Sequence, residues 1–260
     1  MTTRLELLER GSLELEGRLL SASNATFVGE VTLDGVTASC VYKPIRGERT
    51  LWDFPEGTLA HRERAAYLVS VATGVPQVPP TVLRAGPFGP GMCQLWIDED
   101  AEQEMVDVVP AGEVPDGWLH VLDAEDHRRR AVSLVHRDDP GLQLMVVLDA
   151  VINNADRKGG HVLVDARGRM FGVDHGVCFH HEDKLRTVLW GWAGEQLPEA
   201  CRELLHRLRA ALDADLSAEL GALLTRDEVT MTCRRVERLL AAGRFPTPSA
   251  SWPAIPWPAF

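Results

Sequence analysis

The sequence predicts an α+β protein built from two lobes with a cleft between them. Strand patterns and one helical segment fill the first part of the chain, an acidic connector follows at 98–104, and helical spacing prevails from about Trp118 onward. A chain of 260 residues has room for one large domain or two small ones. We therefore expect a β-rich N-terminal lobe at 1–98 and a mainly helical C-terminal lobe at 99–260.

The N-terminal part carries the signals of antiparallel strands and a single helix. The pair Asp34-Gly35 lies between two alternating segments, which is typical of a hairpin turn. Residues 58–71 predict a helix that Thr58 caps. The predicted strands are residues 13–20, 27–33, 37–43, 81–84 and 92–97.

The C-terminal part is expected to be helical around one small hairpin. A helix begins after Asp139, because Pro140 fits the first helical position and the apolar residues that follow keep helical spacing. The capping-box pair Thr225 and Glu228 predicts another helix start. The remaining predictions are a polar loop at 153–160, strands at 161–165 and 170–173, helices at 199–212 and 226–242, and a Pro- and Trp-rich tail at 245–260. This extended tail docks on the body or engages a protein partner.

Charge and cysteine usage exclude several classes of protein. The chain has 27 Lys and Arg against 38 Asp and Glu, a net charge of −11, so we expect no binding of nucleic acid or of an anionic membrane surface by bulk charge. No apolar run approaches the roughly 20 residues of a membrane-spanning helix, and the N-terminus lacks a secretory signal pattern. Five irregularly spaced cysteines predict free thiols. We expect a cytoplasmic protein without an integral membrane segment.

The densest group of polar residues runs from Asn153 to Asp174. It passes from a helix end through a loop and across the predicted hairpin, which would bring Asp156, His161 and Asp174 together. Phosphoryl transfer needs such a set: one carboxylate orients the incoming hydroxyl, a cation offsets the phosphate charge, and further ligands hold divalent metal. Nearby, His175, Cys178, His180 and His181 match no closed zinc motif.

This segment resembles the catalytic core of the protein-kinase-like superfamily, in particular the phosphatidylinositol 3- and 4-kinases and related atypical kinases. Residues 156–161 (DRKGGH) are similar to the catalytic loop D-x-K-x-x-N, and residues 173–176 (VDHG) are similar to the metal motif D-x-G. The resemblance implies that Asp156 is the catalytic acid/base, that Lys158 faces the γ-phosphate of ATP, and that Asp174 binds metal.

The resemblance extends upstream and covers roughly residues 15–180. Residues 40–44 (CVYKP) are similar to the strand motif whose lysine reaches the α- and β-phosphates, and a glutamate in the next helix is similar to that lysine's partner. The turn at 21–26 takes the place of the loop over the phosphates, and 94–97 takes the place of the hinge that contacts adenine. The implied nucleotide-binding residues are Lys43, Glu63, Ser23, Asn24, Thr26, Trp96 and Ile97.

His161 departs from the family pattern, since the family usually has a metal-binding Asn there. An imidazole nitrogen is a softer ligand than an amide oxygen, which favours Mn²⁺ over Mg²⁺. A ligating histidine must be neutral, so the unperturbed pKa of about 6.5 predicts weaker metal binding at pH 6 than at pH 7.5. The alternative is that His161 turns outward or bonds the loop backbone while Asp174 alone holds the metal.

The predicted function is ATP-dependent transfer of the γ-phosphoryl group to a hydroxyl of an unknown small molecule or protein, with ATP and Mg²⁺ or Mn²⁺ as cofactors. Lipid-kinase resemblance does not make the acceptor a lipid, because function follows the site and not the fold. Two alternatives to this function stay open. The first is an inactive nucleotide-binding pseudokinase or scaffold, which the histidine at 161 favours. The second is a transferase of the nucleotidyl (AMP) group.

Overall fold

Five antiparallel strands form one sheet of the computed structural model, which describes residues 2–19, 24–49, 51, 53–54 and 59–260. The strand order is β1-β2-β3-β5-β4. The strands are β1 (Ser12–Arg18), β2 (Phe27–Leu33), β3 (Val36–Pro44), β4 (Thr81–Gly86) and β5 (Gly89–Leu95). At the predicted hairpin, Asp34 and Gly35 both have positive φ, as a two-residue turn of this kind requires, so this turn is confirmed.

Two helices accompany this sheet, whereas the sequence predicted one. Helix α1 (Arg4–Arg10) begins with a capping box between Thr3 and Glu6 and places Leu7 and Leu8 in a small core against the strands. Helix α2 (Leu59–Ala72) follows β3. The predicted cap Thr58 lies outside the described residues. The carboxylate of Glu48 accepts hydrogen bonds from the first two backbone N–H groups of α2, at 3.1 and 2.8 Å, and satisfies donors that a helix start leaves unpaired.

Residues 106–137 form a three-stranded antiparallel sheet, so the prediction that helical structure begins at about Trp118 is wrong for residues 118–137. Its strands, in the order β6-β8-β7, are β6 (Val106–Pro110), β7 (Trp118–Glu125) and β8 (Ala131–Arg137). In β8 the four residues from Ser133 to His136 are all buried, which hides the alternation that marks a strand. The Ser133 hydroxyl donates to Asp123, and His136 Nε2 accepts from the Gly191 N–H, so both polar groups have partners.

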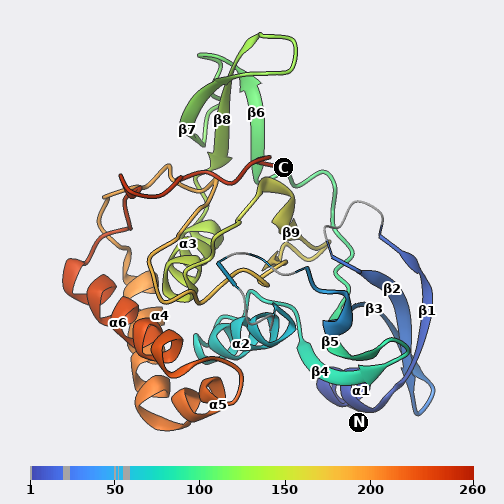
Figure 1. Cartoon of the computed structure of the whole chain (residues 1–260). Helices are drawn as coiled ribbons and strands as arrows, with labels where there is room; N and C mark the ends of the chain where they lie inside the picture. Colours follow the sequence, from blue (N-terminus) through green and yellow to red (C-terminus); the bar gives the residue numbers. More distant parts are fainter. Residues whose placement is uncertain (1, 20–23, 50, 52, 55–58) are drawn as a thin grey trace.

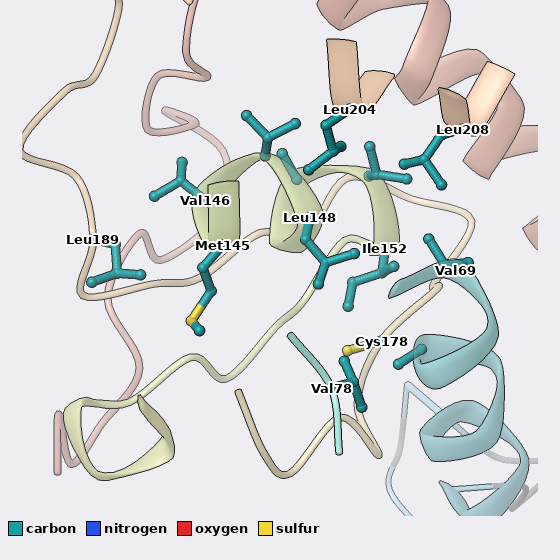
Figure 2. Close-up of a cluster of buried hydrophobic side chains, with 14 of the residues drawn as sticks. Val69, Val78, Met145, Val146, Leu148, Ile152, Cys178, Leu189, Leu204 and Leu208 are labelled. Carbon is teal, nitrogen blue, oxygen red and sulfur yellow. The ribbon is translucent and has the colours of Figure 1, made fainter. Parts of the chain in front are cut away.

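Helix α3 (Pro140–Ile152) is the centre of the main core (Figure 2). Asp139 caps it and Pro140 occupies its first turn, as predicted. Its buried side chains lie against side chains of α2, of α4 (Glu199–Ala211) and of residues 178–189. The α3 side chains labelled in Figure 2 are Met145, Val146, Leu148 and Ile152. Burial on nearly every side makes α3 a fixed platform for that loop.

The remaining helices and the tail cover α3. A short hairpin, β9 (Val162–Val164) and β10 (Met170–Gly172), follows the loop after α3, as predicted. Helix α6 (Arg226–Ala242) begins with the predicted capping box. The other segments are the 3₁₀ turns Ile45–Gly47 and Gly159–His161, a π-helical turn Leu212–Leu216, and α5 (Ser217–Gly221). Figure 1 shows the tail running from α6 back toward β9 and the base of the three-stranded sheet. The chain is thus a mixed α and β protein.

No helix among the described residues is long and apolar enough to cross a membrane.

Shortening a side chain of α3 should test this core. Leu148 exposes only 2% of its surface, so Leu148→Ala is expected to lower the free energy of unfolding by about 2–5 kcal/mol through lost burial and a residual cavity. Leu144, on the same helix but only partly buried, is the matched control. Leu144→Ala should cost clearly less in a denaturant titration, and equal losses would contradict the central place of Leu148.

Candidate active site

A cavity of about 360 Å³ gathers residues that are far apart in the sequence. Its walls come from the turn before β2, the end of β3, the start of α2, the loop after α3 and the segment after β10. The lining residues include Asn24, Lys43, Glu48, Arg49, Glu63, Asp156, Asp174 and Arg186. Five residues predicted from the sequence, Asn24, Lys43, Glu63, Asp156 and Asp174, therefore line one cavity.

Lys43 lies between two carboxylates. Its Nζ is 2.7 Å from Glu63 Oε1 and 2.7 Å from Asp174 Oδ1. Burial alone would lower the pKa of Lys43, but the two carboxylates raise it above its ordinary value, so the amine stays charged. The Lys43 cation in turn holds the pKa of Asp174 well below its usual range. The site thus contains a fixed cation and an ionised carboxylate side by side.

Glu63 joins α2 to the residues after β10. Its Oε1 pairs with Lys43, and its Oε2 accepts a 3.0 Å hydrogen bond from the backbone N–H of His175. Because only 2% of its side chain is exposed, burial raises its pKa against the opposing effect of Lys43. Asp174 itself has φ of +60°, a left-handed conformation that turns the chain between β10 and this contact. The helix and the metal-motif segment are therefore fixed to each other at the cavity.

Asp156 lies across the same cavity at the start of the loop after α3. Burial raises the pKa of Asp156, and Lys158 and Arg186 oppose the rise. Lys158 Nζ is 3.5 Å from Asp156 Oδ2, and Asn154 Oδ1 accepts the backbone N–H of Asp156 at 3.0 Å. A carboxylate of raised pKa beside two cations is suited to taking and returning a proton.

His161 is 3.7 Å from Asp174, measured from Nε2 to Oδ2. Its Nδ1 lies 3.0 Å from the carbonyl oxygen of Asp156, so Nδ1 carries the proton as donor and Nε2 carries a lone pair. Burial lowers the pKa of His161 to about 4. A pKa this low leaves the ring neutral at both pH 6 and pH 7.5, so the titration of His161 gives no reason for metal binding to change between them.

Arg157 connects α3, the loop after it and the residues on both sides of Asp174. Its side chain is fully buried and forms a two-point contact with Asp149 of α3, at 2.8 and 2.9 Å. The same guanidinium donates to the carbonyls of His161 and Val173, both at 3.1 Å, and to Nε2 of His175 at 2.8 Å. Burial and this cation hold the pKa of His175 well below its usual range. No local sequence pattern predicts this role of Arg157, because its partners are spread over residues 149–175.

Gly172 makes room for this arginine. A Cβ at Gly172 would lie 2.8 Å from Nη2 of Arg157, which is too close for two non-bonded atoms. The glycine is thus required by the close approach of the guanidinium to the end of β10.

Among the residues that the structure describes, three that were predicted to bind nucleotide, Thr26, Trp96 and Ile97, do not line this cavity. Ser23 lies outside the described residues. Thr26 is buried, with Oγ1 donating to the carbonyl of Asn24. Trp96 and Ile97 follow directly after β5, where Trp96 is exposed and its backbone N–H donates to Ser39. Their contact with adenine stays a prediction.

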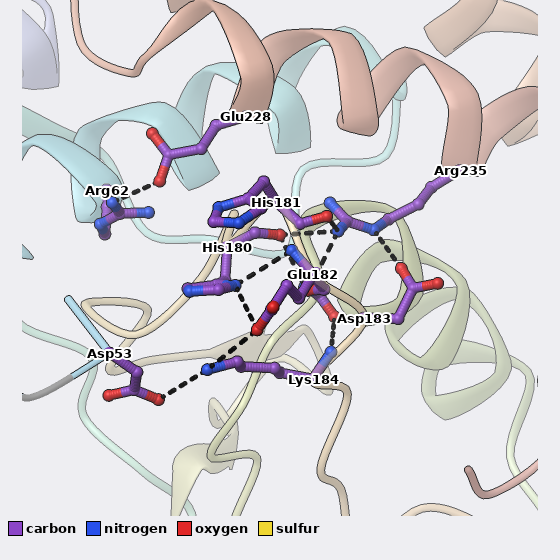
Figure 3. A network of polar contacts seen from close by, with 10 residues as sticks. Asp53, Arg62, His180, His181, Glu182, Asp183, Lys184, Glu228 and Arg235 are labelled. Atoms are coloured by element: carbon purple, nitrogen blue, oxygen red, sulfur yellow. Dashed lines mark hydrogen bonds and ion pairs between the residues drawn. The ribbon is translucent and has the colours of Figure 1, made fainter. Parts of the chain in front are cut away.

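A second polar network lies around residues 180–184, and next to it a buried ion pair anchors α2 (Figure 3). Arg62, next to Glu63, donates to the carbonyl of Cys178 and pairs with Glu228 of α6 at 2.5 Å, both side chains being buried. Lys184 pairs with Asp53 at 3.3 Å, and Arg235 pairs with Asp183 at 3.2 Å. The sequence carried no local signal for these pairs, because their members are far apart along the chain.

No group of three or more His, Cys, Asp or Glu in the part of the chain that the structure describes could hold a metal ion by itself. Among the histidines considered for zinc, His175 is buried against Arg157, and the rings of His180 and His181 stack on each other with centroids 4.4 Å apart. The described side chains at this cavity therefore do not form a complete metal site by themselves.

Comparison with known proteins yields one extensive sequence match. No family model matches the chain. Protein Rv2133c of Mycobacterium tuberculosis (strain ATCC 25618 / H37Rv) is 46% identical over 263 residues, which cover 98% of this chain and 94% of that protein. A solved structure of a Helicobacter pylori proinflammatory kinase, CtkA, aligns with a TM-score of 0.43 and 10% identity over 92% of this chain and 94% of that chain. A TM-score of this size does not establish a common fold.

Removing the buried arginine should be costly. Arg157→Met leaves Asp149 buried without its counter-charge, so the free energy of unfolding is expected to fall by about 3–5 kcal/mol. Arg202→Met is the matched control, because Arg202 pairs with Glu199 at 2.9 Å with both side chains exposed, and an exposed pair contributes about 0–1 kcal/mol. Similar losses for the two variants in denaturant titrations would show that Arg157 is not a structural centre.

Proposed function

We propose that this chain, which belongs to the same family as the Mycobacterium tuberculosis protein Rv2133c, is a phosphotransferase that moves the γ-phosphoryl group of ATP to a hydroxyl group. The observation that carries the proposal is the position of Lys43, 2.7 Å from both Glu63 and Asp174 and on the same cavity as Asp156. A lysine oriented by a carboxylate, a metal-binding carboxylate and a proton acceptor are the parts that phosphoryl transfer needs.

The residues present fit a nucleotide-bound divalent cation. Asp174 offers an ionised carboxylate, and the Nε2 lone pair of His161 lies 3.7 Å from it. These two side chains would hold the metal together with phosphate oxygens of ATP. When bound, the cation supplies charge neutralisation on the phosphates. Lys43, held by Glu63, directs a further positive charge at the same phosphates.

Asp156 would orient the acceptor and take its proton. The acceptor oxygen forms a bond to the γ-phosphorus, the bond from that phosphorus to the β-phosphate oxygen breaks, and ADP leaves. The hydroxyl proton passes to the Asp156 carboxylate. Burial raises the pKa of this carboxylate, and Lys158 and Arg186 oppose the rise. A raised pKa makes the carboxylate a stronger base for that proton. Lys158 is also near enough to Asp156 to face the transferred group.

The proposed architecture is a protein-kinase-like one of two lobes, with the phosphatidylinositol 3- and 4-kinase type as the nearest pattern. The five-stranded sheet with α1 and α2 would be the N-terminal lobe, at 1–98, and the remainder would be the C-terminal lobe, at 99–260. Two features support it: the sheet has its own small core, separate from the main core around α3, and the cavity takes residues from both parts. The acceptor is a small molecule or a protein hydroxyl.

Substitutions of Asp156 and Lys43 should affect different steps: the first should lower turnover, and the second should weaken nucleotide binding. Asp156→Asn is expected to keep nucleotide binding and lose about 10²–10⁴-fold in ADP release, the usual contribution of a positioned acid–base group. Lys43→Met is expected to weaken binding itself. The measurements are ADP release and thermal unfolding with ATP and Mg²⁺ or Mn²⁺, where ligand at 100-fold over Kd adds about 2.7 kcal/mol of stability.

Three outcomes of these measurements would speak against the proposal. Intact ADP release in Asp156→Asn would remove the assigned role, and no thermal shift with any nucleotide would contradict nucleotide binding altogether. Product mass gives the third: a gain of AMP instead of one phosphate would favour nucleotidyl transfer.

Metal preference should depend on His161. We expect the wild-type protein to prefer Mn²⁺ to Mg²⁺, because an imidazole nitrogen suits Mn²⁺ better. The preference should be the same at pH 6 and pH 7.5, since a pKa of about 4 leaves the ring neutral at both, and it should weaken only as pH approaches 4. His161→Asn should shift the preference toward Mg²⁺. The measurement is the ratio of nucleotide affinities with Mn²⁺ and with Mg²⁺. The same ratio in wild type and His161→Asn would exclude His161 as a ligand.

A further inference from the structure

Residues 252–260, here called the strap, lie on the loop that carries Asp156 and Lys158. The backbone N–H of Gly159 donates a 2.8 Å hydrogen bond to the carbonyl of Ala259. The ring of Phe260 lies directly over Gly159, where a Cβ would collide with it. Figure 1 shows this end of the tail beside β9, the strand that follows the loop. The function described above uses none of these contacts.

The strap also binds the segment next to the loop. The carbonyl of Ala254 accepts hydrogen bonds from the backbone N–H of Thr187 at 3.0 Å and from the indole of Trp190 at 2.9 Å. That segment is itself paired with the loop, because the Arg157 N–H donates to Arg186 at 3.0 Å and the Val188 N–H donates to Arg157 at 3.1 Å. Backbone hydrogen bonds therefore join the loop to residues 186–188, and residues 186–188 to the strap.

Trp252 places a third contact near the cavity. Its ring lies 4.6 Å from the Lys184 amine and 5.8 Å from the Arg186 guanidinium carbon, measured to the ring centroid, distances typical of cation–π contacts. Arg186 lines the cavity, and its Nε donates to the carbonyl of Ala155, the residue before Asp156. The indole thus supports an arginine that contacts both the loop and the cavity.

We propose that the strap is a positioning element for the catalytic loop, with Trp252 and Phe260 as its positioning residues. Lys158 is followed by two glycines, Gly159 and Gly160, which have the greatest backbone freedom. A loop of this composition needs an outside restraint to keep Asp156 and Lys158 in one geometry. The strap supplies it by bonding the Gly159 N–H and filling the space where a side chain would otherwise be. The catalytic part of this inference rests on the proposed phosphotransferase function.

Substitutions in the strap test the restraint without reference to activity. Trp252→Ala and Phe260→Ala should each speed hydrogen–deuterium exchange in a peptide spanning 155–161, while a peptide within α3 keeps its exchange rate. Trp257→Ala is the matched control: Trp257 belongs to the strap but is 84% exposed, so exchange should not change. Trp252→Phe, which keeps an aromatic face, should restore most of the protection. Unchanged exchange at 155–161 in both alanine variants would overturn the strap.

Kinetics then test its catalytic meaning. We expect Trp252→Ala and Phe260→Ala to lower the kcat for ADP release by about 10- to 100-fold, as small displacements of catalytic groups do. The nucleotide Kd should stay unchanged in Phe260→Ala, because Phe260 lies on Gly159, which does not line the cavity. Faster exchange with unchanged kcat would reduce the strap to a structural brace and overturn the positioning role. A different result would be wild-type protein that releases no ADP together with faster exchange in the variants. It would reject the phosphotransferase function and the positioning role, but the structural restraint of the loop by the strap would still be supported.

A steric pair gives an independent check of the Phe260 contact. Gly159→Ala should displace the ring of Phe260 and speed exchange at 155–161. In a Phe260→Ala background the added methyl has nothing to collide with, so Gly159→Ala should then cause no further change in exchange. Additive effects of the two substitutions would contradict the contact.

Discussion

The geometry of the site depends on one buried ion pair, between Arg157 of the loop after α3 and Asp149 of α3. Burying a guanidinium costs several kcal/mol unless its donors are satisfied, and Arg157 bonds Asp149, two backbone carbonyls and the His175 ring. Since those partners lie on α3, on the loop and on both sides of Asp174, one side chain sets the distances among them. Their mutual positions hold only while this arginine is satisfied.

Helix α2 is held as firmly from the other side of the cavity. Glu48 caps its first turn, Glu63 bonds both Lys43 and the backbone of His175, and Arg62 pairs with Glu228 of α6. Two consecutive residues of one helix therefore face two different parts of the molecule. This arrangement fixes the Lys43–Glu63 pair through contacts of the protein alone.

Local sequence signals predicted the elements that depend on local physics. Asp34-Gly35 gave the hairpin because both residues tolerate positive φ, and Asp139-Pro140 and Thr225–Glu228 gave helix starts because capping involves only neighbours. The sheet at 106–137 was missed because β8 buries four consecutive residues, including Ser133 and His136, whose polar groups find partners only in the folded chain. Helix α1 was missed although Thr3 and Glu6 carried a capping-box signal.

The sequence by itself determined which residue types could do chemistry and roughly where the chain would bring them: Lys43, Glu63, Asp156 and Asp174 were identified before any geometry was known, and they line one cavity. Only the tertiary structure decided the electrostatics. The neutral state of His161, the sharing of Lys43 between two carboxylates and the role of Arg157 all follow from burial and from partners distant in sequence. The placement of the tail on Gly159 is of the same kind, because no local pattern encodes a contact between residues 100 positions apart.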